Sequence, residues 1–244
     1  MGKLIVVTSG KGGVGKSTVS TGLAAALCSM NKSVLLVDAD EGLRCLDLLL
    51  SISDKLVFDM GDILSGNVDI DKAINKVDGE DSLYLLAAPS APLSINSESF
   101  GKLMLELRNK YDYVIVDCPA GIDNKYYVCL PKDSEFLIVT NSDAVSVRNA
   151  FEITNLLSSL KFTNKRLVLN RFDKRTAKKF KLLVDDIIDN SGVRLLAVIP
   201  EDSQVKVAAL KGKVLKLGRA AMALHRAAAR IQGLDVPLPK LNKI

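Results

Sequence analysis

The 244-residue sequence has no tryptophan, few aromatic residues and no paired cysteines. With aromatics at 5% and hydrophobic residues at 48%, leucine, valine, isoleucine and alanine must build the core, and a chain of this length can bury one without disulfides. The scattered Cys28, Cys45, Cys118 and Cys129 include no C-x-x-C pair, and His225 is the only histidine. A disulfide-stapled miniprotein and a Cys/His zinc site are therefore not expected.

The sequence also lacks a long apolar run and a signal peptide. No stretch approaches the ~18 apolar residues of a membrane-spanning helix. The apolar residues 4–7 are too short for the hydrophobic part of a signal peptide, and glycines follow at once. The balance of 48% hydrophobic and 25% charged residues, with a net charge of +5, is that of an ordinary globular protein and excludes a disordered chain and a collagen. We expect a cytoplasmic protein with reduced thiols, at most peripheral at the inner face of the cell membrane.

Short β-rich apolar runs alternate with longer helical stretches. The predicted strands are residues 3–8, 33–38, 83–88, 113–117, 135–140, 166–170 and 195–199. The predicted helices are residues 16–30, 97–110, 145–160, 177–190, 204–211 and 217–232. Near-continuous Val/Ile/Leu runs are typical of strands buried on both faces. This order predicts an α/β fold, a mostly parallel β-sheet flanked by helices on both faces in a three-layer sandwich. Residues 1–233 are expected to form one domain, followed by a short tail at 234–244.

Residues 10–17 match G-x-x-x-x-G-K-[ST] between a predicted strand and a predicted helix, the context that a P-loop requires. Glycines let backbone N–H groups wrap a polyphosphate, and the following helix adds unpaired N–H groups and a positive dipole end. Lys16 is placed for the β- and γ-phosphates, and the Ser17 hydroxyl for Mg²⁺. The nucleotide-binding residues expected here are Gly12, Gly13, Val14, Gly15, Lys16, Ser17 and Thr18.

Carboxylates follow two of the predicted strands. Asp38 and Asp40 close the second strand and face the same side if the chain stays extended. Two like charges there repel unless a cation such as Mg²⁺ lies between them, although an acidic loop or helix cap is the alternative. Asp117 ends the apolar run 113–117 in a Walker B pattern. The metal-site residues expected are therefore Ser17, Asp38 and Asp117.

Two later strand ends are candidates for contacts with the base. Asn170 and Arg171 end one strand, and an Asn amide can both donate to and accept from adenine, although a strand-end cap is the other possibility. Pro200, Glu201 and Asp202 follow the last strand, and their backbone could bracket the base.

The P-loop carries a second lysine, Lys11, which the general pattern does not require. With it, residues 11–18 resemble the deviant Walker A motif of the MinD/ParA family of P-loop NTPases. The resemblance implies ATP and Mg²⁺ as cofactors, a catalytic Lys11 that reaches the nucleotide of a partner subunit, and a catalytic Asp40 that orients the attacking water beside Lys16. Residues 40–47, 117–122 and 199–202 are more similar to the MinD members than to the ParA members.

The resemblance implies an ATP hydrolase that acts as an ATP-driven dimerisation switch in placing the division septum. Its expected partners are a second copy of the chain, an activating protein and a membrane surface, with non-specific DNA as a further possibility. One expected departure is that residues 235–244, with Pro237 and Pro239, do not form the amphipathic C-terminal helix with which MinD proteins bind membranes. A ParA-like or flagellar-number-regulator-like ATPase and a P-loop amide-ligase-type enzyme stay open as alternatives.

Two groups of basic residues have no role in these motifs. Arg219, Arg226 and Arg230 fall on one helical face, and a second group comprises Lys174, Arg175, Lys178, Lys179 and Lys181. Solvated helix faces explain both groups, and contact with an anionic surface is the alternative.

Overall fold

The computed structural model describes residues 1–41, 44–90, 96–121, 126–180 and 184–239. Its centre is an eight-stranded sheet with the order β3-β4-β2-β5-β1-β6-β7-β8. The strands are β1 (Lys3–Thr8), β2 (Val34–Asp38), β3 (Ile74–Lys76), β4 (Leu83–Leu86), β5 (Tyr113–Asp117), β6 (Glu135–Thr140), β7 (Lys165–Phe172) and β8 (Leu195–Pro200). Every neighbouring pair is parallel except β3 and β4. The predicted α/β class with a mostly parallel sheet is confirmed.

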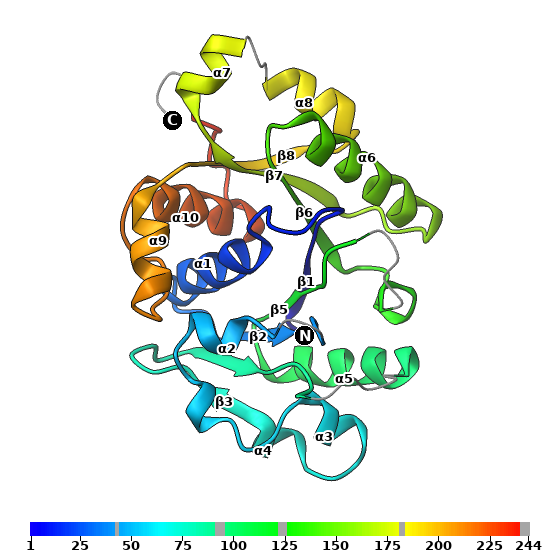
Figure 1. Ribbon diagram of the computed structural model, residues 1–244. Helices are drawn as coiled ribbons and strands as arrows, with labels where there is room; N and C mark the ends of the chain where they lie inside the picture. Colours follow the sequence, from blue (N-terminus) through cyan, green and yellow to red (C-terminus); the bar gives the residue numbers. More distant parts are fainter. Residues whose placement is uncertain (42–43, 91–95, 122–125, 181–183, 240–244) are drawn as a thin grey trace.

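Helices connect the strands and cover both faces of the sheet (Figure 1). The helices are α1 (Lys16–Cys28), α2 (Leu46–Leu49), α3 (Met60–Leu64), α4 (Ile70–Ala73), α5 (Ser97–Lys110), α6 (Ala144–Ser159), α7 (Lys174–Phe180), α8 (Val184–Ser191), α9 (Ser203–Leu210) and α10 (Arg219–Ile231), with 3-10 turns η1 (Ser53–Lys55) and η2 (Tyr127–Cys129). None of the helices in the described ranges is both long and apolar enough to cross a membrane.

Two apolar layers hold the sandwich together. On one face α1 and α10 pack on the sheet, with Leu23, Leu27 and Leu224 almost fully buried. On the other face α5, α6 and α8 pack through side chains such as Phe100 and Ile153. Successive residues of a strand point alternately into the two layers, which explains why the central strands are apolar throughout.

The strand register brings the ends of β1, β2 and β5 together. Asp38 pairs with Asp117, and Val7 pairs with Asp117 on the other side of β5. The carboxyl ends of these parallel strands therefore lie at one edge, where open α/β sheets bind ligands.

The structure adds to the predicted elements in one place and leaves one prediction untested. Residues 177–180 and 184–190 of the predicted helix 177–190 are helical, in α7 and α8, and residues 181–183 between them lie outside the described ranges. Residues 54–80, which showed no regular pattern, contain α3, α4 and the short strand β3. Because β3 is an edge strand of three residues that includes Asn75 and Lys76, it lacks the apolar run from which the other strands were predicted.

Candidate functional site

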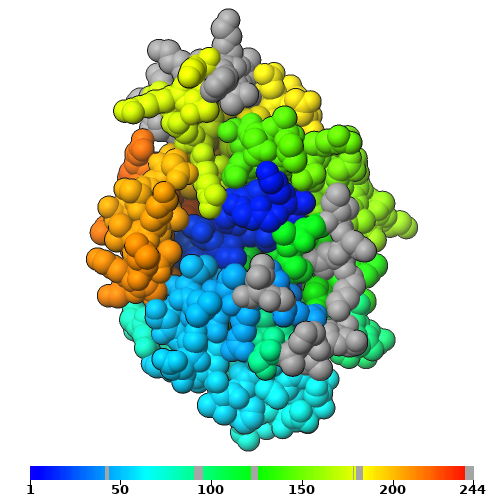
Figure 2. Space-filling model, viewed as in Figure 1, coloured from blue at the N-terminus to red at the C-terminus, as the bar shows by residue number. Residues whose placement is uncertain are grey.

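The predicted P-loop lies between β1 and α1, at the carboxyl edge of the sheet. Figure 2 shows this N-terminal segment, in blue, near the centre of the viewed face. Two of its glycines need to be glycine, since Gly13 and Gly15 have φ angles of 77° and 95°. A Cβ on Gly15 would also lie 2.3 Å from Asn170 Nδ2, whereas a Cβ on Gly12 would meet nothing within 4 Å. The loop backbone is therefore held in a left-handed turn against β7.

The N-terminus of α1 is suited to an anion. Gly15 is its N-cap, no side chain caps it, and its first turn has no acidic residue. The free N–H groups and the helix dipole both favour negative charge at this point. Lys16 begins the helix and is 9% exposed, while Val14 is buried in the apolar layer beside α1. These groups together form a cradle for phosphate.

Asp117 lies buried at the end of β5, beside α1. Its carboxylate accepts a hydrogen bond from Ser20 Oγ at 2.9 Å, and the Ser17 hydroxyl lies close enough to lower its pKa. Burial raises the pKa of Asp117 to about 7, and the negative charge of Asp38 adds to the rise, while the serine hydroxyls oppose it. A buried carboxylate beside a second carboxylate favours a nearby cation.

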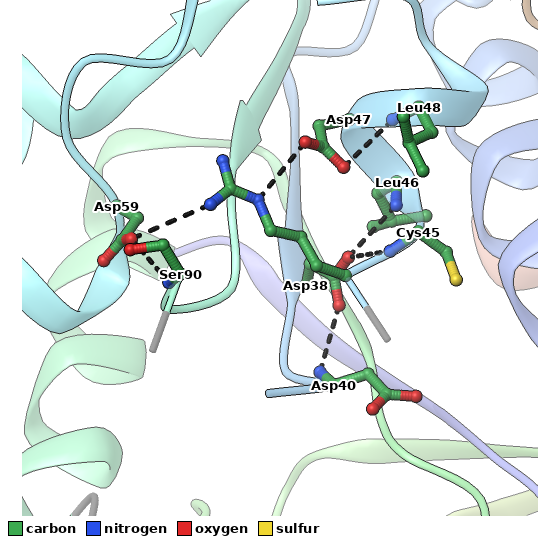
Figure 3. Close-up of polar contacts among 9 residues, drawn as sticks. Asp38, Asp40, Cys45, Leu46, Asp47, Leu48, Asp59 and Ser90 are labelled. Carbon is green, nitrogen blue, oxygen red and sulfur yellow. Dashed lines mark hydrogen bonds and ion pairs between the residues drawn. The ribbon is translucent and has the colours of Figure 1, made fainter. Parts of the chain in front are cut away.

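Asp38 ends the neighbouring strand and organises the loop that follows it. Its Oδ1 accepts from the backbone N–H of Asp40 at 3.0 Å, and its Oδ2 accepts from Cys45 and Leu46 at 3.0 and 3.1 Å (Figure 3). Burial raises the pKa of Asp38 to about 6, although these three N–H groups oppose the rise. Both oxygens are therefore already engaged by the backbone, so Asp38 fixes Asp40 and the start of α2.

A second group of contacts ties the same loop to α3. Arg44 Nε donates to Asp47 Oδ2 at 3.2 Å, and an Arg44 terminal nitrogen lies 3.9 Å from Asp59 Oδ2. That Asp59 oxygen also accepts from the Ser90 backbone N–H at 2.8 Å (Figure 3). The loop beyond Asp40 is thus anchored at both ends. Gly42 and Leu43, which belong to the predicted segment 40–47, lie outside the described residues.

The oxygen atoms at this edge of the sheet suit Mg²⁺, which binds partly through water and phosphate, better than a metal ion whose ligands all come from the protein. The described ranges contain no group of three His, Cys, Asp or Glu side chains arranged to hold a metal ion. Mg²⁺ prefers oxygen, keeps several waters and is usually bound by one or two carboxylates together with substrate phosphates. Asp117 and the Ser17 hydroxyl supply such oxygens next to the phosphate cradle.

The two segments predicted to contact the base meet beside the P-loop. They line a hollow of about 220 Å³ together with Thr18 and Val19, and the lining includes Asn170, Arg171, Pro200, Glu201 and Asp202. The hollow opens beside the N-terminal turn of α1, which is the side on which the base of a P-loop nucleotide would have to lie.

The side chains in this hollow have structural partners that were not predicted. Asn170 Nδ2 donates to the Val14 carbonyl at 2.8 Å, so it holds the P-loop. Asp202 accepts from Gln204 N at 2.9 Å and Ala220 N at 3.0 Å, and so ties α9 to α10. Arg171 is exposed, with a φ of 52°.

Lys11 lies beside the start of α6 in its own chain. Its Nζ lies 3.8 Å from Asp143 Oδ1 at the start of α6, and its side chain is 47% exposed. An exposed pair at this distance contributes little to stability. Lys11 can therefore leave Asp143 at little cost.

Three site residues were missed in the sequence. Ser20 lies one helical turn after Ser17, so the spacing on α1 could have indicated that it faces Asp117 too. Asn141, with its amide turned to match its neighbours, donates to the carbonyls of Val14 and Asn170. Tyr127 bonds the Thr8 hydroxyl at the end of β1, and no local pattern indicates a contact over 119 positions.

Comparisons with known proteins agree with this geometry. Residues 5–215 match the family model described as the CobQ/CobB/MinD/ParA nucleotide binding domain. The septum site-determining protein MinD of Synechocystis is 37% identical over 244 residues, covering 97% of this chain and 92% of that protein.

Two solved structures are similar over nearly the whole chain. The MinC:MinD cell division protein complex of Aquifex aeolicus gives a TM-score of 0.89 at 35% identity, covering 98% of this chain and 99% of that chain. The septum site-determining protein MinD of Pyrococcus horikoshii, complexed with Mg-ADP, gives 0.82 at 26% identity, covering 95% and 96%. With its P-loop, buried carboxylates and base-side hollow at one edge of the sheet, the chain belongs to the MinD/ParA family of nucleotide-binding P-loop proteins, among its MinD-like members.

Proposed function

We propose that this protein is a Mg²⁺-dependent ATPase that works as an ATP-driven dimerisation switch, as a MinD-like protein in the placement of the division septum. The observation that carries the proposal is the uncapped N-terminus of α1, with Lys16 in its first turn, beside the buried pair Asp38 and Asp117. Such a site binds a phosphate chain on one side and a cation on the other. A nucleotide triphosphate with Mg²⁺ satisfies both.

Different residues would bind the phosphates, the metal ion, the attacking water and the base. The P-loop backbone and Lys16 hold the phosphates, and Ser17 with Asp117 would hold Mg²⁺, which supplies positive charge to the transferring phosphoryl group. Asp40, fixed through its own N–H by Asp38, would orient the attacking water. The base would lie in the hollow beside Asn170, Arg171 and residues 200–202.

Lys11 would complete the site of a second subunit. Its half-exposed side chain and loose contact with Asp143 leave it free to reach across a face-to-face dimer. The γ-phosphate of the nucleotide in the second subunit would replace Asp143 as the anionic partner of Lys11. The dimer would therefore form with ATP and separate after hydrolysis. This coupling makes the enzyme a switch.

The cellular setting belongs to the same proposal. Since the Aquifex MinD relative is seen in a complex with MinC, we propose that the ATP-bound dimer of this chain also has an activating or effector protein partner, and that it acts in the cytoplasm at the inner face of the membrane. The ParA-like and amide-ligase alternatives are not proposed, since the Synechocystis and Aquifex relatives, at 37% and 35% identity over nearly the whole chain, are MinD proteins.

Steady-state ATP hydrolysis and fluorescent-nucleotide binding test the enzymatic part. Lys16→Ala should abolish nucleotide binding, and Asp40→Ala should bind ATP but hydrolyse it at least 100-fold more slowly, because only the water's orientation is lost. Lys102→Ala, an exposed lysine on α5, is the matched control. Turnover by Lys16→Ala at the rate of the control would refute the mechanism.

A further inference from the structure

A basic surface with protruding leucines surrounds α9, outside the nucleotide site. Residues 203–234 include four lysines and three arginines but no aspartate or glutamate. We call its outer part the α9 surface, which consists of Val207, Leu210, Lys211, Lys213, Lys216 and Leu217. Figure 2 shows α9 and the loop after it, in orange, at the left edge of the viewed face.

The apolar side chains of the α9 surface are far more exposed than packing requires. Leu210 is 88% exposed and Leu217 is 73% exposed, and α9 has no buried residue at all. Single exposed leucines are common, but two of them among lysines on one protruding segment need a reason. The α9 surface is also continuous, because Val207, Lys211, Lys213, Lys216 and Leu217 all line one hollow of about 400 Å³.

Two of the three lysines of this surface, Lys211 and Lys213, keep a positive charge that the described residues of the protein do not neutralise. Two acidic residues line the same hollow, and both are paired, Glu80 with Lys216 at 2.6 Å and Asp78 with Lys55 at 2.6 Å. Among the described residues, no carboxylate forms an ion pair with Lys211 or Lys213. The α9 surface therefore offers free cations next to free apolar groups.

We propose that the α9 surface binds the surface of a bilayer that contains anionic phospholipids. Lipid headgroups would neutralise Lys211 and Lys213, while Leu210 and Leu217 would enter the boundary with the acyl chains. Duplex DNA would use the lysines but would leave both leucines in water, so the leucines favour the bilayer. The proposal does not depend on ATP hydrolysis, since none of these four residues lines the base hollow or the P-loop.

Co-flotation of the full chain with lipid vesicles tests whether the α9 surface binds a bilayer. Phosphatidylcholine vesicles with about 30% phosphatidylglycerol should carry the wild-type protein, and pure phosphatidylcholine should not. The double variant Lys211→Gln/Lys213→Gln should bind about 30-fold more weakly, because each lysine near an anionic surface is worth ~1 kcal/mol. Leu210→Gln/Leu217→Gln should lose about tenfold or more, while the control Leu105→Gln on α5, also exposed, should bind as the wild type.

Because the sequence has no tryptophan, a single introduced tryptophan reports how deeply its position enters the bilayer. Leu210→Trp makes the only tryptophan of the chain, and its emission should shift to the blue with anionic vesicles and be quenched by brominated acyl chains. Leu105→Trp should show neither effect. The proposal is overturned if vesicles do not bind the wild type, if the leucine pair can be replaced without loss, or if Leu210→Trp stays in water while the lysines bind duplex DNA.

Discussion

Replacing Asp117 by asparagine should stabilise the protein without ligands and at the same time destroy its Mg²⁺-dependent function. The carboxylate is 3% exposed and lies beside Asp38, so ionising it in the folded state is costly. The pKa rises from 3.8 to about 7. At ~1.36 kcal/mol for each pH unit, this is a cost of about 4 kcal/mol when the group is ionised in both states.

The direction of the pKa shift of Asp117 determines how the stability of the protein depends on pH. Because the folded-state pKa is raised, the folded protein holds its proton more tightly than the unfolded chain, so stability is fully present below pH 3.8 and falls as pH rises towards about 7. An asparagine has no such dependence and can still accept the bond from Ser20. The gain for Asp117→Asn should therefore be up to about 4 kcal/mol at pH 8 and about 1.5 kcal/mol at pH 5.

Urea unfolding of the nucleotide-free protein at both pH values measures this gain. Asp186→Asn, an exposed aspartate on α8, makes the same change in net charge and should change stability by less than about 0.5 kcal/mol. Nucleotide binding by Asp117→Asn should no longer respond to Mg²⁺. A variant that is less stable than the wild type at pH 8, or a gain that does not shrink at pH 5, would refute the electrostatic reasoning.

Three further changes have defined outcomes. Gly15→Ala should lower the unfolding free energy by about 2 kcal/mol, because Gly15 has a φ of 95° and a close neighbour. Gly12→Ala should change it by under about 0.5 kcal/mol, because a Cβ there would meet nothing within 4 Å. Thermal melts that ranked the two variants equally would contradict this. Asn170→Ala should weaken ATP binding about tenfold, because it removes the shorter of the two amide hydrogen bonds to the Val14 carbonyl and leaves only that from Asn141. Fluorescent-nucleotide titration measures this, and unchanged affinity would rule the Asn170 contact out as a support of the loop. Arg108→Ala should cost about 2 kcal/mol in urea unfolding, since its buried guanidinium bonds Gly2 O and both Asp133 oxygens; a loss below about 0.5 kcal/mol would mean that these bonds are not needed.

The parts of the site that follow from local pattern were predictable from the sequence. A glycine-rich turn between an apolar strand and a helix leaves few alternative backbones, so the phosphate cradle and the start of α1 at Lys16 follow from residues 3–17. The positions of Asp38 and Asp117 follow as well, because parallel strands bring their carboxyl ends to one edge.

The partners of these side chains were not predictable, because they depend on contacts far apart in the sequence. The contact expected between Asn170 and adenine stays a prediction, but the sequence did not indicate that the Asn170 amide donates to the carbonyl of Val14, 156 positions away. The place of Asp38 at the metal also stays a prediction, and the sequence could not show that its oxygens accept hydrogen bonds from three backbone N–H groups.

The central claim is that ATP joins two copies of this chain, and the molar mass in solution tests it most directly. Light scattering on a sizing column should give twice the chain mass of 26.3 kDa for Asp40→Ala with ATP and Mg²⁺, and one chain mass with ADP. Adding Lys11→Ala to the same variant should restore the single mass with ATP. One mass under all of these conditions, in a protein that still binds ATP, would contradict the account.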